Sequence, residues 1–104
     1  MPVISKVLSR TAAATSSATL YTVPNSSTVT VVTNIVIANA AASASTATIS
    51  IDAVQVIPAV SIAANSVFGF DLKQVIPANA TPKTITGFAS STSVTFHISG
   101  VEIA

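Results

Sequence analysis

Apolar and polar residues alternate through much of this chain, and we expect the fold to be built around the segment from Thr28 to Ala38. The segment carries no charge, Gly or Pro, and most of its residues are β-branched, which disfavours helix and suits a pleated sheet. At a period of two, the face expected in the core consists of Val29, Val31, Thr33, Ile35 and Ile37. The other face is mixed and consists of Thr28, Thr30, Val32, Asn34, Val36 and Ala38. A long strand left at an open edge would pair with other chains, so we expect a neighbouring strand on each side.

Further segments with strand patterns flank this one and are separated by turn signals. They cover residues 18–23, 46–57, 67–76, 83–89 and 93–103. In the segment 46–53, Ala and Ile alternate with Thr, Ser and Asp, which is the cleanest pattern of a half-buried strand. The turn before the central segment is predicted from Pro24-Asn25, since Pro fixes φ and Asn favours turns.

The aromatic residues are expected to lie in the core. In the segment 67–76, Asp71 and Lys73 share one face, so the core face should carry Phe68, Phe70, Leu72 and Gln74. In the segment 83–89, Ile85 is expected to point inward, with Phe88 as a further candidate.

The last segment, 93–103, contains a change of pattern at Gly100. Val94, Phe96 and Ile98 alternate on one face, and after Gly100 the apolar positions are Val101 and Ile103. A β-bulge at the Gly would bring all five apolar residues to one core face.

Seven or eight short strands with turn signals between them, and no helical segment, indicate an all-β domain. We predict an antiparallel two-sheet sandwich of jelly-roll or Greek-key kind. A chain of 104 residues is long enough for one such core.

The first residues fit neither the strand period nor the helix period. Residues 2–10 contain Lys6 and Arg10, half of the basic residues of the chain, and Thr11–Ser17 is a run of Ala, Ser and Thr that reads as a linker. Two interpretations stay open: a short first strand, or an extended arm that lies on a neighbouring subunit. The division that we adopt is an arm and linker at 1–17 and a sandwich domain at 18–104. Lys6 and Arg10 are then the candidate partner-binding residues.

Charge is scarce in this chain. Charged residues make up 7% of the sequence, against about 25% in ordinary soluble domains. The 41 residues from Thr11 to Ile51 carry no charge, so this surface needs Ser and Thr, or a partner, to cover it. The net charge of +1 gives no long-range attraction for nucleic acid or an anionic membrane. No apolar run approaches the ~18 residues of a spanning helix, and the basic start lacks the apolar segment of a signal peptide.

The sequence contains no recognisable catalytic or metal-binding pattern. A Ser nucleophile needs a His and an orienting acid, but His97, the one His, has no acid beside it. A metal site would have to collect His97 with Asp52, Asp71 and Glu102, and no spacing suggests it. Tyr21 fits the edge of a core better than a ligand platform. We therefore expect neither an enzyme nor a cofactor.

Several short motifs resemble a known group of proteins. They are Ala18-Thr19-Leu20-Tyr21-Thr22-Val23-Pro24, Ile35-Val36-Ile37-Ala38-Asn39, Ile62-Ala63-Ala64-Asn65-Ser66, Ser93-Val94-Thr95-Phe96 and Gly100-Val101-Glu102-Ile103. From Ala18 onward, the chain resembles small β-sandwich virion proteins of tailed bacteriophages and prophages.

The resemblance implies a non-enzymatic role in many copies on a phage particle. The simplest such role is that of a capsid decoration (cement) protein on the outer capsid surface, where it clamps neighbouring major-capsid subunits, commonly as a trimer. Lys6 and Arg10 would then reach an acidic shell surface. The alternatives are a tail or baseplate component and a host-binding adhesin domain. The long uncharged stretch independently favours a homo-oligomer.

Overall fold

The residues that the structure describes form eight β-strands in two antiparallel sheets. The computed structural model describes residues 3–104, apart from the side chain of Phe70. The strands are β1 (Val3–Ala12), β2 (Ala18–Thr22), β3 (Val29–Asn39), β4 (Ser45–Ile51), β5 (Val54–Ile62), β6 (Ser66–Ile76), β7 (Thr84–Ala89) and β8 (Val94–Ile103). The described residues contain no helix. This confirms the all-β antiparallel sandwich predicted from the alternation pattern.

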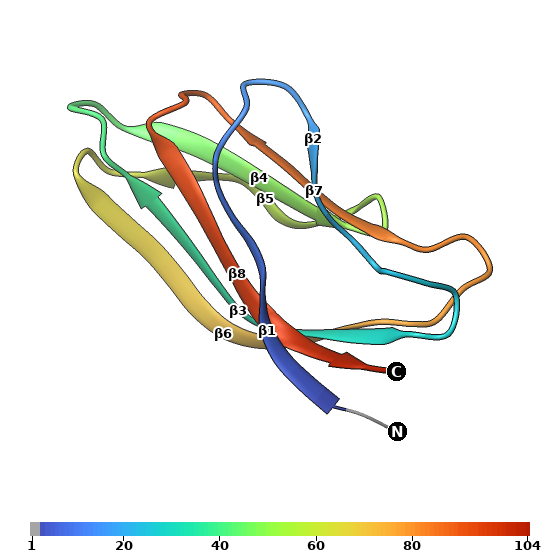
Figure 1. Cartoon of the computed structure of the whole chain (residues 1–104). Helices are drawn as coiled ribbons and strands as arrows, with labels where there is room; N and C mark the ends of the chain where they lie inside the picture. The colour runs from blue at the N-terminus through green and yellow to red at the C-terminus, as the bar shows by residue number, and fades with distance from the viewer. Residues whose placement is uncertain (1–2) are drawn as a thin grey trace.

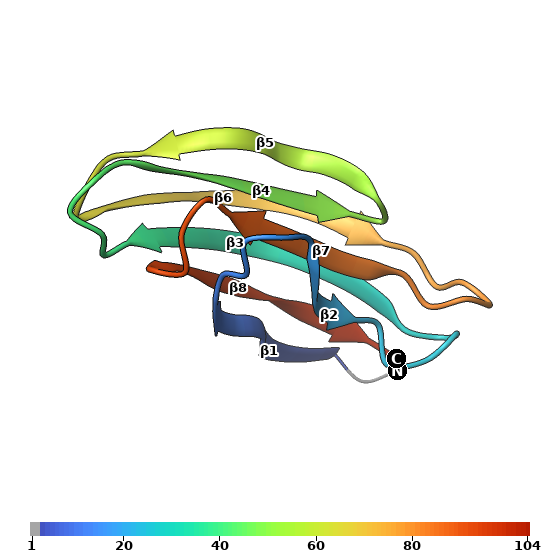
Figure 2. The same cartoon turned by 90° about the horizontal axis from the view of Figure 1, so that it is seen from above.

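The strand order is that of a jelly roll. One sheet has the order β1-β8-β3-β6 and occupies the lower part of Figure 1, and the other has the order β2-β7-β4-β5 and occupies the upper part. Strand β1 therefore pairs with β8, β2 with β7, β3 with β6 and β4 with β5. These are the pairs formed when one long antiparallel hairpin is rolled into two layers. Figure 2 shows the two layers from above.

The core lies between the two layers and is mostly aliphatic. Its fully buried side chains include Val32, Ile35, Ile37, Ile49, Ile76, Ile85, Val94, Phe96 and Ile98. Phe68 and Leu72 pack against this core, as predicted, whereas Gln74 is exposed and the Phe70 side chain lies outside the described part. Phe88 points outward and is 37% exposed, because the buried Ile85, Gly87 and Ala89 occupy the inward positions of β7.

Strand β3 has neighbours on both sides, β6 and β8, but its predicted face assignment is correct only in its second half. The register of β3 shifts between Val32 and Asn34 against both neighbours, so Thr33 is a bulge residue. A bulge inserts one residue and exchanges the two faces of the strand beyond it. As a result Thr30 and Val32 are buried before the bulge, whereas Val29 and Val31 point outward.

The predicted change of face at Gly100 is wrong. Strand β8 alternates regularly along its whole length, so Gly100 and Glu102 point inward while Val101 and Ile103 point outward. The bulges lie in the two strands that flank β8, at Leu8 in β1 and at Thr33 in β3. The inward position of Gly100 is crowded, since a Cβ there would lie 2.8 Å from Leu8 Cδ1 and 2.3 Å from the carbonyl oxygen of Val31.

The segment expected as an N-terminal arm is a strand of the sandwich in this structure. Strand β1 pairs with β8 from Val3↔Ile103 to Ala12↔Thr95 and forms the edge of its sheet. Of the two interpretations, the short first strand describes residues 3–12. This strand gains its ladder hydrogen bonds from β8, so no separate arm precedes residue 18 in the described part.

Candidate functional site

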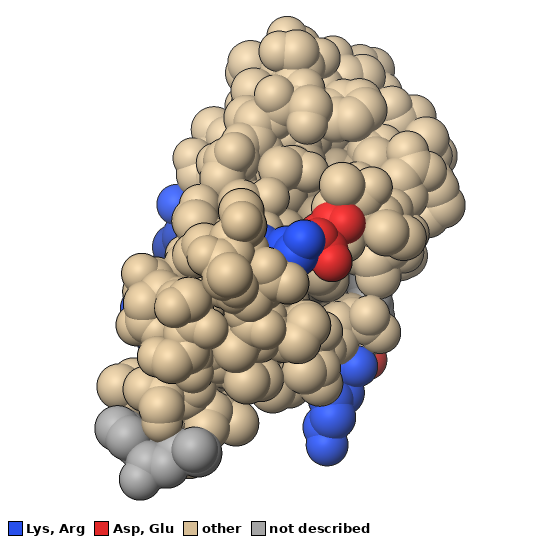
Figure 3. All heavy atoms as spheres, turned by 90° about the vertical axis from the view of Figure 1, so that its right-hand side faces the viewer, with Lys and Arg blue, Asp and Glu red and all other residues tan. Residues whose placement is uncertain are grey.

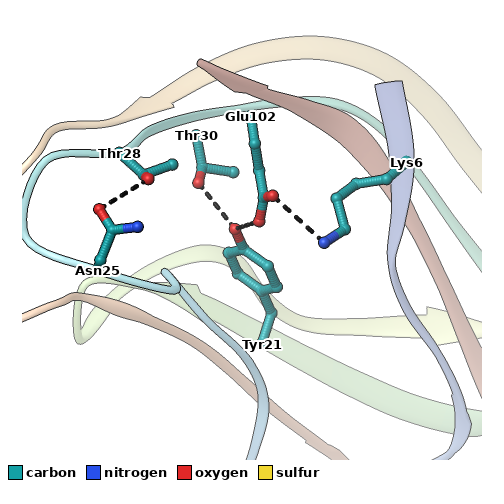
Figure 4. A network of polar contacts seen from close by, with 6 residues as sticks. All are labelled: Lys6, Tyr21, Asn25, Thr28, Thr30 and Glu102. Carbon is teal, nitrogen blue, oxygen red and sulfur yellow. Dashed lines mark hydrogen bonds and ion pairs between the residues drawn. The ribbon is translucent and has the colours of Figure 1, made fainter. Parts of the chain in front are cut away.

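A cluster of polar side chains lies between the sheets at one end of the sandwich. Glu102 projects inward from β8 and is 8% exposed. Tyr21, from β2 of the opposite sheet, donates its phenolic hydrogen to Glu102 Oε2. Lys6 Nζ, from β1, lies 3.2 Å from Glu102 Oε1. The Tyr21 oxygen is also 2.8 Å from Thr30 Oγ1 on β3, so the cluster joins four strands (Figure 4).

The environment of Tyr21 keeps its hydroxyl protonated. Burial raises the pKa of Tyr21 from 10.0 to about 12, and the hydrogen bond to Glu102 and the charge of that carboxylate act in the same direction. The contact with Thr30 acts in the opposite direction, toward a lower pKa. Since the one phenolic hydrogen is given to Glu102, the Thr30 hydroxyl donates to the Tyr21 oxygen. The cluster is thus a chain of satisfied hydrogen bonds that holds the two sheets together, and not a nucleophile with its base.

The two candidate partner-binding residues lie on opposite faces of β1. Lys6 faces the polar cluster, and its side chain is 43% exposed while it is paired with Glu102. Arg10 is exposed and lies beside His97 in the register with β8. Among the described residues, Arg10 takes part in no ion pair. The structure therefore does not bring the two cations into one site.

The remaining titratable groups are spread over the surface. His97 faces outward on β8, and its Nε2 lies 3.2 Å from Thr95 Oγ1. Asp52 pairs with Lys83 at 3.4 Å, and Asn34 donates to Asp71 at 3.0 Å. Within residues 3–104, no three His or acidic side chains come together in a way that could hold a metal ion. On the face shown in Figure 3, charged side chains form small separate groups on an otherwise uncharged surface.

The depressions of the surface carry little chemistry. One, of about 230 Å³, opens between the β4–β5 turn and the end of β6, and Asp52 is the one charged residue that lines it. Its other polar side chains are Gln55 and Gln74. In the part of the chain that the structure describes, no helix is long and apolar enough to cross a membrane.

The comparisons with known proteins show the fold. No protein-family model and no curated protein matches the chain. Among solved structures, it is similar to the NLP core of Drosophila, with a TM-score of 0.54 and 16% identity over 98% of both chains. That structure is described in terms of pentamer formation and histone binding.

Virus particles supply further similar structures. A chain of infectious bursal disease virus, Gx strain, matches with a TM-score of 0.52 and 15% identity over 97% of this chain. A chain of the T13 particle of the same virus matches with a TM-score of 0.52 and 12% identity. The present chain spans 30% of each of these viral chains. Chains of virus particles therefore share this fold, at identities too low to carry a function across.

Proposed function

We propose that the chain is a non-enzymatic structural protein of a virus particle. More specifically, it decorates the outer capsid surface of a tailed phage and clamps neighbouring major-capsid subunits. The observation that carries the proposal is a two-sheet sandwich with few unpaired charges on its outer surface. Four of the seven charged side chains form ion pairs within the chain: Lys6 pairs with Glu102, and Lys83 pairs with Asp52.

A surface of this kind suits a protein that is held among copies of itself and a shell. It offers no long-range electrostatic steering, so attachment has to rest on shape, on apolar contact and on many weak contacts acting together. The jelly roll that the chain shares with chains of virus particles supports the same reading. The motifs from Ala18 onward resemble those of phage virion proteins, and this resemblance favours a phage as the source of the particle.

Arg10 is the better of the two proposed partner-binding residues. Lys6 would have to leave Glu102 before it could bind an external acid, and it would leave a buried carboxylate without its cation. Arg10 carries no such cost, since it is exposed and has no ion pair among the described residues. We propose that Arg10 contacts an acidic group of a neighbouring subunit.

The alternatives differ in location and in partner. A tail or baseplate component, or a host-binding adhesin domain, would use the same fold in fewer copies. A basic partner, such as the histones named for the Drosophila NLP core, finds no matching surface charge here. The chain has three acids, and Asp52 and Glu102 are in ion pairs. A trimer, the assembly that the resemblance favours, stays a prediction.

The decisive experiment counts the chain in purified particles. Particles are banded on a density gradient, and the chain is quantified against the major shell protein by mass spectrometry with labelled standard peptides. A decoration protein should be present in hundreds of copies, and adding the purified chain to undecorated shells should raise their rupture temperature. A count of about six or twelve copies would indicate the tail or baseplate. Absence from the particles would refute the structural role.

A further inference from the structure

The two outer faces of the sandwich differ in chemistry. The register of the second sheet shows that the outward positions of β2, β4 and β7 carry hydroxyl residues at all places but one. These residues are Thr19, Thr22, Thr46, Thr48, Ser50, Thr84 and Thr86, and the exception is Phe88. Hydroxyl groups at outward positions can bond to water without a partner. Thr48 is only 5% exposed and accepts a bond from the amide of Ala59. The other outward hydroxyl positions of β2, β4 and β7 are suited to solvent.

The outer face of the other sheet is aliphatic at one end. Two adjacent cross-strand rows contain six β-branched aliphatic residues, which we call the aliphatic patch. The patch consists of Val3, Ile103 and Val29 in one row and of Val101, Val31 and Val75 in the next. Val3 and Val75, at the two edges, are 64% and 56% exposed. This asymmetry identifies the sheet β1-β8-β3-β6 as the one that gains from being covered.

The patch alone is too small for a stable contact. Two rows across four strands cover roughly 250 Å² of flat surface, and the whole face of the sheet covers roughly 600 Å². A standard interface buries ~800 Å² on each partner. A partner must therefore cover the whole face, including its more polar end, and must present an apolar surface to the patch.

A second copy of the chain meets both requirements through one symmetry operation. The patch lies at one end of the face, so only a two-fold axis parallel to the strands places patch on patch while the whole faces overlap. Around this axis, Val29 and Val31 of β3 lie over Ile103 and Val101 of the second copy's β8. Sheets packed in this way commonly cross at about 30°, because each is twisted.

The same operation brings opposite charges together at the polar end. It places β1 of one copy over β6 of the other, because these strands are the two edges of the sheet. Arg10 on β1 faces outward in register with His97, Val36 and Gly69. On the same face of β6, Asp71 lies one row away from this register, and Lys73 lies one position farther toward the aliphatic patch. The two-fold axis repeats the contact, so two Arg10–Asp71 pairs form. The positions of Arg10 and Asp71 are independent of the apolar rows that define the axis, and they agree with it.

We propose that the outer face of the sheet β1-β8-β3-β6 is the surface by which two copies of this chain associate, face to face. This inference rests on the proposed structural role, and it identifies the neighbouring subunit that Arg10 contacts as a second copy of the chain. An isologous contact joins copies in pairs, so assemblies built on it contain an even number of chains. A trimer would need a different, heterologous contact.

The first experiment compares two substitutions at matched positions. Val31→Lys places a charge in the aliphatic patch on the central strand β3, and Thr86→Lys places the same charge on the hydroxyl face on the central strand β7. Circular dichroism establishes that both variants fold, and sedimentation velocity measures their association. We expect the wild type and Thr86→Lys to form dimers or larger even-numbered species at micromolar concentration, and Val31→Lys to be monomeric.

A charge exchange then tests the orientation of the two copies. Arg10→Asp and Asp71→Arg should each weaken self-association about tenfold or more, as close charge pairs across interfaces do. The double variant Arg10→Asp/Asp71→Arg should restore it, because the pairs form again with reversed signs. Failure of the double variant to recover would overturn the proposed two-fold arrangement.

Two further outcomes would overturn the interface. A wild-type chain that is monomeric or trimeric would do so, and so would a dimer that Val31→Lys leaves intact. A monomeric chain found in hundreds of copies on particles would refute this interface while leaving the proposed function in place.

Discussion

The hydroxyl of Tyr21 on β2 donates to the carboxylate of Glu102 on β8, and the bond joins the two sheets near the last residues of the chain. Glu102 is one of the few buried polar residues and has two partners, Tyr21 and Lys6. A buried carboxylate is tolerated only when it is paired and hydrogen-bonded. The bond should therefore contribute measurably to stability.

Removing the phenolic hydroxyl should destabilise the fold. Tyr21→Phe leaves one carboxylate oxygen of Glu102 and the hydroxyl of Thr30 without their partner, and the loss should be about 1–3 kcal/mol. Urea unfolding followed by circular dichroism measures it. Thr22→Val, which removes an exposed hydroxyl from the same strand, is the control and should change stability little. Equal stability of Tyr21→Phe and the wild type would contradict the structural role of the cluster.

Stability should fall at high pH because of the same residue. The folded pKa of Tyr21 is raised from 10.0 to about 12, so the unfolded chain loses this proton first. The contribution is fully present below pH 10 and is lost as the pH rises toward 12, which corresponds to roughly 2–3 kcal/mol.

Tyr21 is the one tyrosine and the chain has no Trp, so ultraviolet absorbance reports its titration alone. The test is the difference in pH dependence between the wild type and Tyr21→Phe, because the variant lacks the phenolic group. Parallel curves for the two proteins would argue against the raised pKa.

The bulge at Thr33 reverses the face assignment that the sequence pattern predicts. Thr30 is fully buried and bonded to Tyr21, whereas Val31 points outward. Thr30→Asp should therefore bury an unpaired carboxylate and prevent folding or lower stability by several kcal/mol, on the order of 3 or more. Val31→Asp should fold and should lose much less stability than Thr30→Asp, because its carboxylate lies on the outer face of the sheet. Thermal unfolding by circular dichroism compares them, and a larger loss for Val31→Asp would place the strand in the other register.

The sequence is sufficient for the class of fold and for local turns, because these depend on neighbouring residues. Alternation of β-branched residues predicts the strands, and Pro24-Asn25 predicts a turn. In the structure, the Asn25 side chain stabilises this turn by accepting a hydrogen bond from the amide of Ser27 at 2.9 Å. The hairpin turn at Asp52-Ala53 is missed. Both residues have positive φ, 53° and 62°. Turns of this kind are usually recognised in a sequence by Asn-Gly or Asp-Gly, and Asp-Ala lacks the glycine.

Contacts between residues far apart in the sequence were not predictable. A bulge depends on the register against a neighbouring strand, so nothing within 28–38 marks Thr33 as its position. The same holds for Glu102, whose partners are 81 and 96 residues away. Asn39 is another example, since its side-chain amide bonds to the carbonyl oxygens of Ile62 and Ala63 at 3.1 and 3.2 Å. The sequence pattern predicts Lys6 and Arg10 as partner-binding residues, but it does not indicate their opposite orientations on β1.

Gly100 provides the sharpest test of how the three strands β1, β8 and β3 fit together. Its inward position lies between the bulges of the two flanking strands, and a Cβ there would approach the Val31 carbonyl oxygen to 2.3 Å. That oxygen belongs to the backbone of the central strand, so it cannot move aside by a change of rotamer. Gly100→Ala should therefore cost about 1–3 kcal/mol or more through overpacking.

Gly69→Ala on the edge strand β6 is the matched control, because its nearest neighbour would be Val36 Cγ2 at 3.3 Å, a side-chain methyl group. We expect chemical denaturation to show a large loss for Gly100→Ala and a small change for Gly69→Ala. Similar stability of the two variants would mean that β3 and β8 do not approach each other in this register.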